Sequence, residues 1–262
     1  MTSPSTLFGL DGQVALVMGG GGAIGSALAV GLAGAGAKIV VAGRTSAALE
    51  SAAERVRATG SEAIAIVADA NDPNSCERLV SEAVDQLGRI DIIVNAVGGG
   101  AGKVLFDAEA YPADAWEWIY DLNVRSTLYP TQAAVRAMIR GGRGGRVLNI
   151  SSVRALLGIN AGYSAYVAAK GAIASLTRQW ATEWAKHGIT VNAISPTFVD
   201  TPQVATLLGD PAFKAGIVNR IPLRRVGSTD DLVGPCLLFC SSAGSFVTGQ
   251  MLTIDGGLTA TQ

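Results

Sequence analysis

The 262-residue sequence has few charged side chains, few cysteines and a single histidine. Charged residues make up 16% of the chain, whereas globular proteins average about 25%. Lys and Arg number 20 and Asp and Glu number 21, so the formal net charge is −1. This balance supplies no bulk field that would attract a phosphate backbone or an anionic membrane surface. We therefore expect neither nucleic acid nor a membrane as a partner.

The three cysteines are Cys76, Cys236 and Cys240, which is too few and too odd a number for a disulfide framework. Cys236 and Cys240 lie four residues apart, but no CxxC motif or neighbouring histidine accompanies them. The segment MTSPSTLFGLDG has neither the basic region nor the apolar core of a signal peptide. We expect buried structural thiols, no metal site and a cytoplasmic location.

Residues 14–37 carry no charge over a length that would cross a bilayer. Four consecutive glycines at 19–22 would break a spanning helix near its middle. The segment is therefore interpreted as a short strand, a glycine turn and a separate helix.

Apolar runs bounded by turn residues alternate with helical patterns along the whole chain. The expected strands are 14–18, 38–42, 63–67, 91–95, 146–150, 189–194 and 251–254. The expected helices are near 23–36, 46–59, 74–87, 114–140, 164–186 and 229–241. Such alternation indicates βαβ units with right-handed crossovers. It predicts a doubly wound, Rossmann-type α/β fold, with a parallel sheet of about seven strands, helices on both faces and a single domain over 1–262.

One low-complexity segment, RGGRGGR at 140–146, allows two interpretations. Arg-Gly tracts occur in nucleic-acid binding. This one lies between a predicted helix and a predicted strand, where glycine supplies a helix stop and a turn. The loop interpretation is favoured, and a nucleic-acid module ranks third among the function classes.

The first predicted strand runs directly into a glycine turn, and Gly20, Gly22 and Gly25 satisfy the G-x-G-x-x-G pattern. Residues without a Cβ let the backbone approach a pyrophosphate, and the following helix supplies free N–H groups and the positive end of its dipole. The pattern alone is weak because a run of glycines matches many templates. Its position after the first strand and before the first helix makes a dinucleotide site the preferred prediction.

The second predicted strand ends in Gly43-Arg44 rather than in the acidic residue that would bind an adenosine ribose. An arginine at this position suits a 2′-phosphate, which favours NADP over NAD. NAD is not excluded, because Thr45 and Ser46 could serve a ribose hydroxyl equally well.

Tyr166 and Lys170 are four residues apart on a predicted helix and therefore share one face. A tyrosine has an ordinary pKa of about 10, and a fixed ammonium nearby favours its phenolate. The spacing alone is common, and an exposed Tyr with an extended Lys would give the same pattern. Ser152 strengthens the prediction, since it follows an apolar strand whose carboxyl end should face the cofactor cleft.

The sequence resembles the short-chain dehydrogenase/reductase family over nearly its whole length. The motifs that carry the resemblance are the glycine turn at 19–25, Asp69, Asn95-Ala96-Val97-Gly98, Asn123, Asn149-Ile150-Ser151-Ser152, Tyr166 with Lys170, Ser195-Pro196 through Thr201, and Ile254-Asp255-Gly256-Gly257. Within the family it looks most like gluconate 5-dehydrogenases and mannonate or fructuronate oxidoreductases. The resemblance implies an NAD(P)-dependent enzyme that interconverts a secondary alcohol and a ketone.

The resemblance also implies a role for each matching residue. Tyr166 would transfer the proton, Lys170 would lower its pKa, and Ser152 would hydrogen-bond the reacting oxygen. Asn123 would hold a water in the proton relay. The implied cofactor contacts are Gly19, Gly22, Ile24, Gly25, Arg44, Asp69, Asn95, Gly98, Tyr166, Lys170, Pro196, Val199 and Thr201. A homotetramer is expected as well, because the family usually forms tetramers.

The chain departs from the family pattern at several positions. Met18, Ala23, Ala96 and Thr197 replace residues that are usual there, and the interval from Ser152 to Tyr166 is one residue longer than the commonest one. The longer interval makes Tyr163 a rival acid/base. Tyr163 is set aside because Val167, not a lysine, follows it by four residues.

Substrate specificity is expected from the loops 98–114, 153–163 and 200–222. Arg154 and Tyr163 are candidate substrate contacts, and a guanidinium at 154 could hold a carboxylate by two hydrogen bonds. An Arg154 side chain turned outward, to solvent or to a neighbouring subunit, is the alternative. The predicted substrate is a sugar acid, a polyol or a hydroxyketone. A nucleotide-binding sensor of the same fold without turnover is the second function class.

Replacing Arg44 by alanine tests the cofactor prediction. A charge-assisted contact with the 2′-phosphate is worth about 1.5–3 kcal/mol, or about tenfold to a hundredfold in affinity. Arg44→Ala should therefore raise KM for NADP by that order and leave KM for NAD nearly unchanged, as measured by steady-state kinetics. A wild-type kcat/KM that is higher with NAD would contradict the prediction.

Overall fold

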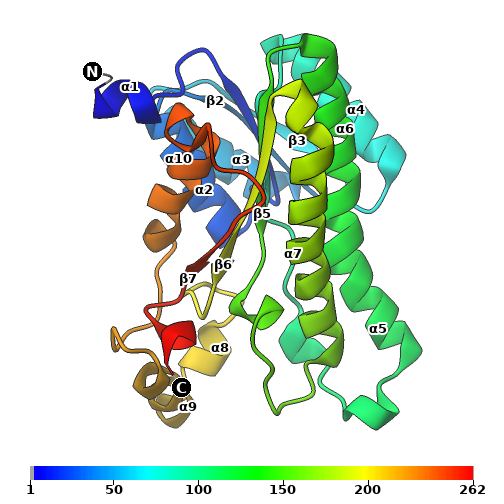
Figure 1. The fold of residues 1–262 in the computed structure, drawn as a ribbon, viewed down its shortest axis with the longest axis vertical. Coiled ribbons are helices and arrows are strands. Elements are labelled where there is room, and N and C mark those ends of the chain that lie inside the picture. Colours follow the sequence, from blue (N-terminus) through cyan, green and yellow to red (C-terminus); the bar gives the residue numbers. More distant parts are fainter. Residues whose placement is uncertain (1–2, 262) are drawn as a thin grey trace.

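The computed structural model describes residues 3–261, and its centre is a seven-stranded parallel sheet in the order β3-β2-β1-β4-β5-β6-β7 (Figure 1). The strands are β1 (Val14–Met18), β2 (Lys38–Gly43), β3 (Ala63–Val67), β4 (Ile92–Asn95), β5 (Gly145–Ile150), β6 (Ile189–Pro196) and β7 (Met251–Ile254). Every neighbouring pair is parallel. The predicted α/β fold and the position of each expected strand are confirmed.

Helices cover both faces of this sheet, and shorter helices lie outside the two layers. The helices are α1 (Pro4–Phe8), α2 (Ala23–Gly34), α3 (Ser46–Arg57), α4 (Pro73–Leu87), α5 (Ala113–Tyr120), α6 (Ser126–Gly141), α7 (Ser164–Trp184), α8 (Ala205–Leu208), α9 (Pro211–Arg220) and α10 (Val233–Cys240). The buried side chains of α2, α3 and α10 pack on one face, and those of α4, α6 and α7 pack on the other (Figure 1).

Strand β1 shows why the sequence contains so little charge. Ala15 and Val17 point into the layer with α2, while Val14, Leu16 and Met18 point into the opposite layer, and all five are 0–1% exposed. Side chains alternate between the two faces of a strand, so a strand covered on both faces must be apolar throughout. This arrangement accounts for the continuous apolar runs in the sequence.

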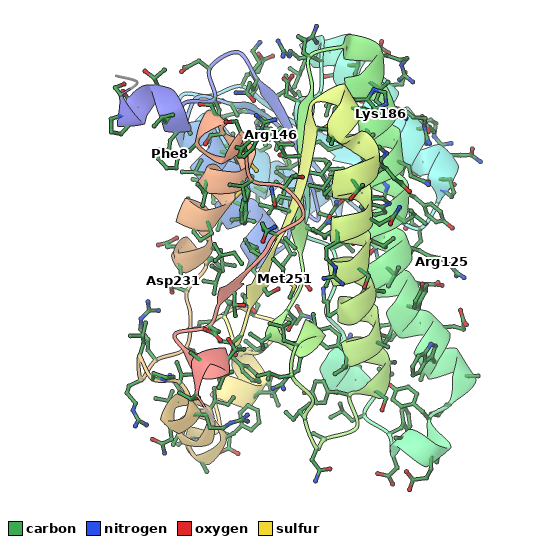
Figure 2. The ribbon with its side chains drawn as sticks, in the orientation of Figure 1. Phe8, Arg125, Arg146, Lys186, Asp231 and Met251 are labelled. Atoms are coloured by element: carbon green, nitrogen blue, oxygen red, sulfur yellow. The ribbon has the colours of Figure 1, made fainter. Side chains whose placement is uncertain are left out.

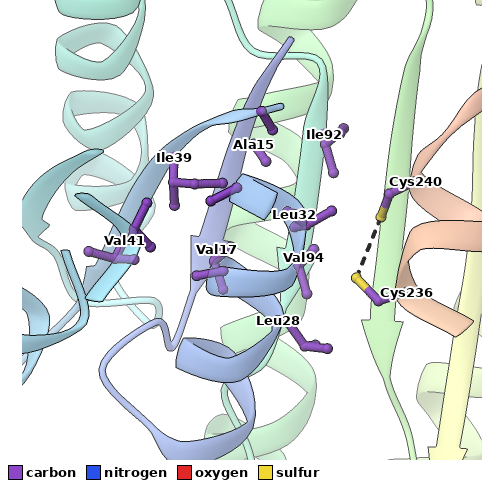
Figure 3. Close-up of a cluster of buried hydrophobic side chains, with 14 of the residues drawn as sticks. Ala15, Val17, Leu28, Leu32, Ile39, Val41, Ile92, Val94, Cys236 and Cys240 are labelled. Carbon is purple, nitrogen blue, oxygen red and sulfur yellow. Dashed lines mark hydrogen bonds between the residues drawn. The ribbon is translucent and has the colours of Figure 1, made fainter. Parts of the chain in front are cut away.

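The first of the two core layers contains two of the three cysteines. Figure 3 shows Leu28 and Leu32 of α2 against the sheet, with Cys236 and Cys240 of α10 close by. The two sulfur atoms are 3.9 Å apart, and both residues are buried as free thiols. Cys76 is likewise buried and free. The prediction of buried structural thiols is confirmed.

The helix expected over 114–140 is interrupted. A π-helical turn at Asp121–Arg125 separates α5 from α6. Such a turn inserts one extra residue into the helical repeat and often marks a functional site. Here the side-chain amide of Asn123 donates to the carbonyl oxygen of Ile119, 2.9 Å away. Its other hydrogen bonds join it to the backbone of Gly99, outside the helix. The interruption depends on these tertiary contacts, which helical periodicity does not reveal.

Two helices lie within the predicted substrate loop 200–222, namely α8 and α9. Asp210 caps α9 by accepting from the backbone N–H groups of Ala212 and Phe213, and Pro211 follows it. An Asp-Pro pair is a typical helix start, so this signal was present in the sequence. The segment after α9 is held by Asp231 (Figure 2), which accepts two bonds from Arg225 and one from the Ser228 N–H.

The structure decides between the alternative interpretations of residues 14–37 and 140–146. Residues 14–37 comprise β1, the glycine turn and α2, and no helix within 3–261 is both long and apolar enough to cross a membrane. The RGGRGGR segment forms the end of α6, a turn and the start of β5. Gly142 adopts φ +64° at the helix end, and its N–H bonds to the carbonyl groups of Met138 and Ile139. The loop interpretation is confirmed.

Candidate active site

The predicted site residues meet at the carboxyl edge of the sheet. β1 pairs with β2 on one side and with β4 on the other, so the chain reverses its winding direction between β1 and β4. In open parallel sheets the crevice at such a switch point binds the ligand. The glycine turn follows β1, Gly98 follows β4, Ser152 follows β5 and Pro196 ends β6.

The glycine turn is packed too tightly to carry side chains. Gly19 has φ +84°, and a Cβ there would lie 2.8 Å from the backbone of Ala96 and Val97. A Cβ on Gly25 would collide with the carbonyl oxygen of Gly19. Gly22 caps α2 without a side-chain bond, and no acidic residue occupies the first turn of this helix. The free N–H groups and the helix dipole therefore fit a pyrophosphate, with Ile24 in the first turn.

The far end of this crevice contains Arg44 and Asp69. Arg44 directly follows β2, is exposed, and makes no side-chain hydrogen bond or ion pair within 3–261. No carboxylate follows β2 to repel a phosphate. Asp69 lies in the turn after β3, is exposed, and accepts from the N–H of Asn71 at 2.9 Å. The chemistry of this end fits a 2′-phosphorylated adenosine.

Ser152, Tyr166 and Lys170 lie together beyond β5. The Lys170 ammonium, 3% exposed, donates to the carbonyl oxygen of Ile150 at 3.0 Å and lies 5.6 Å from the centre of the Tyr166 ring. Ser152 is 8% exposed, and its hydroxyl accepts from the N–H of Arg154 at 3.2 Å. The side chains of Tyr166 and Lys170 face the end of the strand from one side of α7.

Asn123 joins this group through the loop after β4. Its Oδ1 accepts from the Gly99 N–H at 2.9 Å, and its Nδ2 donates to the Gly99 carbonyl oxygen at 3.1 Å. Gly98 has φ +147°, and a Cβ there would lie 2.8 Å from Asn123 Oδ1 and 3.1 Å from Lys170 Nζ. The π turn thus brings Asn123 to the backbone beside the Lys170 ammonium.

Burial shifts the pKa values of both Tyr166 and Lys170. Burial raises the pKa of Tyr166 to about 12, and interaction with the Ser152 hydroxyl opposes this shift. Burial lowers the pKa of Lys170 to about 8. The pKa of Tyr166 is raised, whereas Lys170 was expected to lower it. The loss of hydration of the phenolate outweighs the effect of the surrounding polar groups on this pKa. In the chain by itself Tyr166 is therefore protonated at neutral pH.

Asn95 lies deeper than the sequence suggested. It is 1% exposed, and its Nδ2 donates to Thr131 Oγ1 at 2.7 Å and to Asn149 Oδ1 at 2.9 Å. Its side chain therefore ties β4 to β5 and α6 beneath the crevice. Asn95 Oδ1, Ser195 Oγ and Thr197 Oγ1 are buried and have no hydrogen-bond partner within 3–261. Polar atoms without a partner at the strand ends are available to hydrogen-bond a bound polar group.

The segment after β6 closes the other side of the crevice. Val199, 6% exposed, forms a bridge with Gly227, and the Thr201 carbonyl accepts from the Val204 N–H at 3.0 Å. The amide of Gln203 lies directly over Gly99, where a Cβ would collide with it. Gln203 therefore connects the loop after β6 with the loop after β4. The sequence contains no signal for this contact, because loop paths depend on tertiary packing.

The two candidate substrate contacts lie beside Tyr166. Arg154 is 6% exposed, and its Nη1 donates to the Gly158 carbonyl oxygen at 3.0 Å. In the isolated chain the Arg154 side chain is therefore not turned out into solvent. Tyr163 is half-buried, and its ring packs edge-on against the ring of Tyr166 with centres 6.3 Å apart.

Fold and site together are those of a dinucleotide-binding oxidoreductase, and known proteins agree. The protein family described as Enoyl-(Acyl carrier protein) reductase matches residues 21–259. The chain is 36% identical to the 2-dehydro-3-deoxy-D-gluconate 5-dehydrogenase of Dickeya dadantii, over 97% of this chain and 98% of that protein. It is also 36% identical to the gluconate 5-dehydrogenase of Gluconobacter oxydans, over 97% of each.

Solved structures give the same result. The crystal structure of a gluconate 5-dehydrogenase from Burkholderia cenocepacia, in complex with NADP and tartrate, superimposes with a TM-score of 0.91. It is 34% identical and covers 99% of this chain and 100% of that one. The chain belongs to the short-chain dehydrogenase/reductase family.

The lowered pKa of Lys170 predicts how stability depends on pH. Between about pH 8 and the ordinary lysine value of about 10.5, the unfolded chain binds a proton at this position that the folded chain has lost. The free energy of unfolding of the cofactor-free wild type should therefore rise through this window relative to Lys170→Met, by on the order of 3 kcal/mol. Urea unfolding of both proteins across this range measures the difference. A constant or falling difference would contradict the prediction.

Proposed function

We propose that this chain is an NADP-dependent oxidoreductase that interconverts a secondary alcohol and a ketone, with Tyr166 as the acid/base. The observation that supports this proposal is the convergence of Ser152, Tyr166 and Lys170 at the carboxyl end of β5, beside the glycine turn. Site and cofactor crevice share one sheet edge, as hydride transfer requires.

NADP is the proposed cofactor. The turn at Gly19, Gly22 and Gly25 would hold its pyrophosphate, and Arg44 its 2′-phosphate. The Burkholderia structure was solved with NADP, and the chain offers no carboxylate after β2 that would oppose it. Bound NADP supplies the acceptor or donor of a hydride.

The protein groups handle the proton. The Tyr166 hydroxyl, protonated at neutral pH by its raised pKa, is ready to donate to the oxygen of a ketone. Ser152 holds the same oxygen by a hydrogen bond. Lys170, with a lowered pKa near 8, returns a proton toward the phenolate and helps to bind the ribose. Asn123 orders the backbone at Gly99 and, as the family resemblance implies, a water in the relay.

The substrate class is drawn from the relatives and the loops. Two relatives act, by name, on gluconate and 2-dehydro-3-deoxy-D-gluconate. We propose a sugar acid, a polyol or a hydroxyketone for this chain, bound between the loop after β4 and the segment 200–222. The Gln203 amide packs over Gly99 and so connects these two loops on the side of the crevice proposed for the substrate.

The assembly proposed is a homotetramer in the cytoplasm. Exposed aromatic side chains on α5, namely Trp116, Trp118 and Tyr120, are 37–41% exposed and suit a covered interface. The three free thiols suit a reducing compartment. Light scattering at micromolar concentration should give four chains per particle with closed symmetry. A monomer under these conditions would refute the assembly.

The proton-transfer role of Tyr166 predicts a loss of turnover without a loss of binding. Tyr166→Phe removes one hydroxyl, which should lower kcat by at least about 100-fold and leave the dissociation constant for NADP nearly unchanged. Rates are followed by NADPH absorbance with a panel of sugar acids, polyols and hydroxyketones, and cofactor binding by calorimetry.

Tyr163→Phe is the matched control, because it removes the same hydroxyl from the adjacent ring. It should retain most of the wild-type kcat. Equal losses in the two variants would exclude Tyr166 as the unique acid/base. Cofactor binding by the wild type without oxidation of any alcohol or reduction of any ketone would favour a nucleotide sensor instead.

A further inference from the structure

Arg154 carries a buried charge with no anionic partner. The side chain is 6% exposed and forms no ion pair in the described part of the chain. Within 3–261 its only side-chain hydrogen bond joins Nη1 to the Gly158 carbonyl oxygen. A guanidinium has five N–H donors in a planar fork, so most of its capacity is unused. Nε and Nη2 of Arg154 are not among the fully buried polar atoms that lack a partner within 3–261, so they are accessible to an anionic ligand.

The groups around Arg154 do not supply that anion. Burial lowers its pKa, and the positive charge of Arg220 lowers it further, whereas Tyr163 and Tyr166 act in the opposite direction. Neither tyrosine supplies a carboxylate, and a tyrosine hydroxyl is uncharged at neutral pH. The surroundings of Arg154 are therefore a second cation and two phenols.

Arg220 brings this second cation from a different part of the chain. It is the last residue of α9, is exposed, and lines a cavity of about 710 Å³ together with Gly158 and Arg224. No acidic side chain among the described residues lines this cavity. Gly158 is also the residue that accepts from Arg154, so both arginines lie next to the same loop.

We propose that Arg154 and Arg220 form a carboxylate subsite, so that the substrate is a hydroxy acid or keto acid rather than a neutral polyol or hydroxyketone. This inference rests on the proposed function, because it concerns the substrate of the same site. Arg154 binds the carboxylate through two parallel N–H groups, and Arg220 adds charge from the solvent side.

The position of Arg154 also limits where the carboxylate lies. Its backbone N–H bonds to the hydroxyl of Ser152, and its charge acts on Tyr166. A carboxylate bound by Arg154 is therefore expected on the same side of the site as Tyr166 and Ser152. A short sugar acid satisfies this limit, and a long acyl chain ending in a remote anion does not.

The test measures binding without turnover. In a Tyr166→Phe background, calorimetry with saturating NADP compares D-gluconate with D-sorbitol, which carries a CH₂OH group in place of the carboxylate. The parent should bind gluconate at least about tenfold more tightly than sorbitol. Adding Arg154→Gln should abolish this preference and leave sorbitol binding unchanged. Equal binding of the two ligands by the parent, or no binding of gluconate or tartrate, would overturn the proposal.

Three further variants test whether a folding defect or an unspecific charge effect explains a loss of gluconate binding. Arg220→Gln changes an exposed side chain and should weaken gluconate binding several-fold without altering the melting temperature. Arg143→Gln removes an exposed arginine from the turn after α6 and should change nothing. If Arg154→Gln does not fold, Arg154→Lys keeps the charge, loses the planar fork and should still weaken gluconate binding. Unchanged gluconate binding in both Arg154→Lys and Arg220→Gln would then refute the subsite.

These measurements separate the two proposals. A wild type that turns over no alcohol or ketone, but whose gluconate affinity depends on Arg154, supports the subsite and refutes the enzymatic function. A wild type that oxidises sorbitol as efficiently as gluconate supports the enzymatic function and refutes the subsite.

Discussion

The parallel pairing of β1 with β4 is the constraint on which the site depends. Strands β2 and β3 extend the sheet on one side of this pair and β5, β6 and β7 on the other, so the loops diverge above it and leave a crevice. The pair itself is held by burial on both faces, since every residue of β1 and β4 is buried. This sheet edge positions the glycine turn so close to Ala96 and Val97 that a Cβ on Gly19 would lie 2.8 Å from their backbone.

The buried polar residues at this edge are of two kinds. Some hydrogen-bond to one another, and others carry a charge that the protein pairs only in part. Asn95 and Asn149 are buried and bonded to each other, and Thr131 and Thr177 extend the chain of bonds, so they fix the strands. Lys170 and Arg154 are buried with one carbonyl acceptor each and no carboxylate. A protein that maximised stability alone would pair such charges. Their incomplete pairing is what a substrate and a cofactor can complete.

The expected and observed structures agree where local pattern decides and differ where packing decides. The seven strands were predictable because each is a short apolar run between turn residues. Helix α9 was not predicted, because it lies in a segment assigned as a substrate loop, although Asp210-Pro211 is a local signal for a helix start. The interruption at Asp121–Arg125 was not readable, because the amide of Asn123 bonds to Gly99, which is distant in the sequence. Arg154 has no acidic neighbour in sequence, but whether it faced solvent or a pocket depended on the path of the loop.

The sequence by itself determined the fold class and the residues that meet at the sheet edge. All strands of a parallel sheet end at the same edge, so the residues that follow β1, β4, β5 and β6 lie on one side of the sheet. The tertiary structure alone decided the protonation of Tyr166, the depth of Asn95, the packing of Gln203 over Gly99 and the place of Arg220 in the cavity beside Gly158. These properties depend on solvent exclusion and on distances between segments far apart in the chain. Neither quantity is a function of local sequence, because both arise only when the two helical layers and the loops pack together.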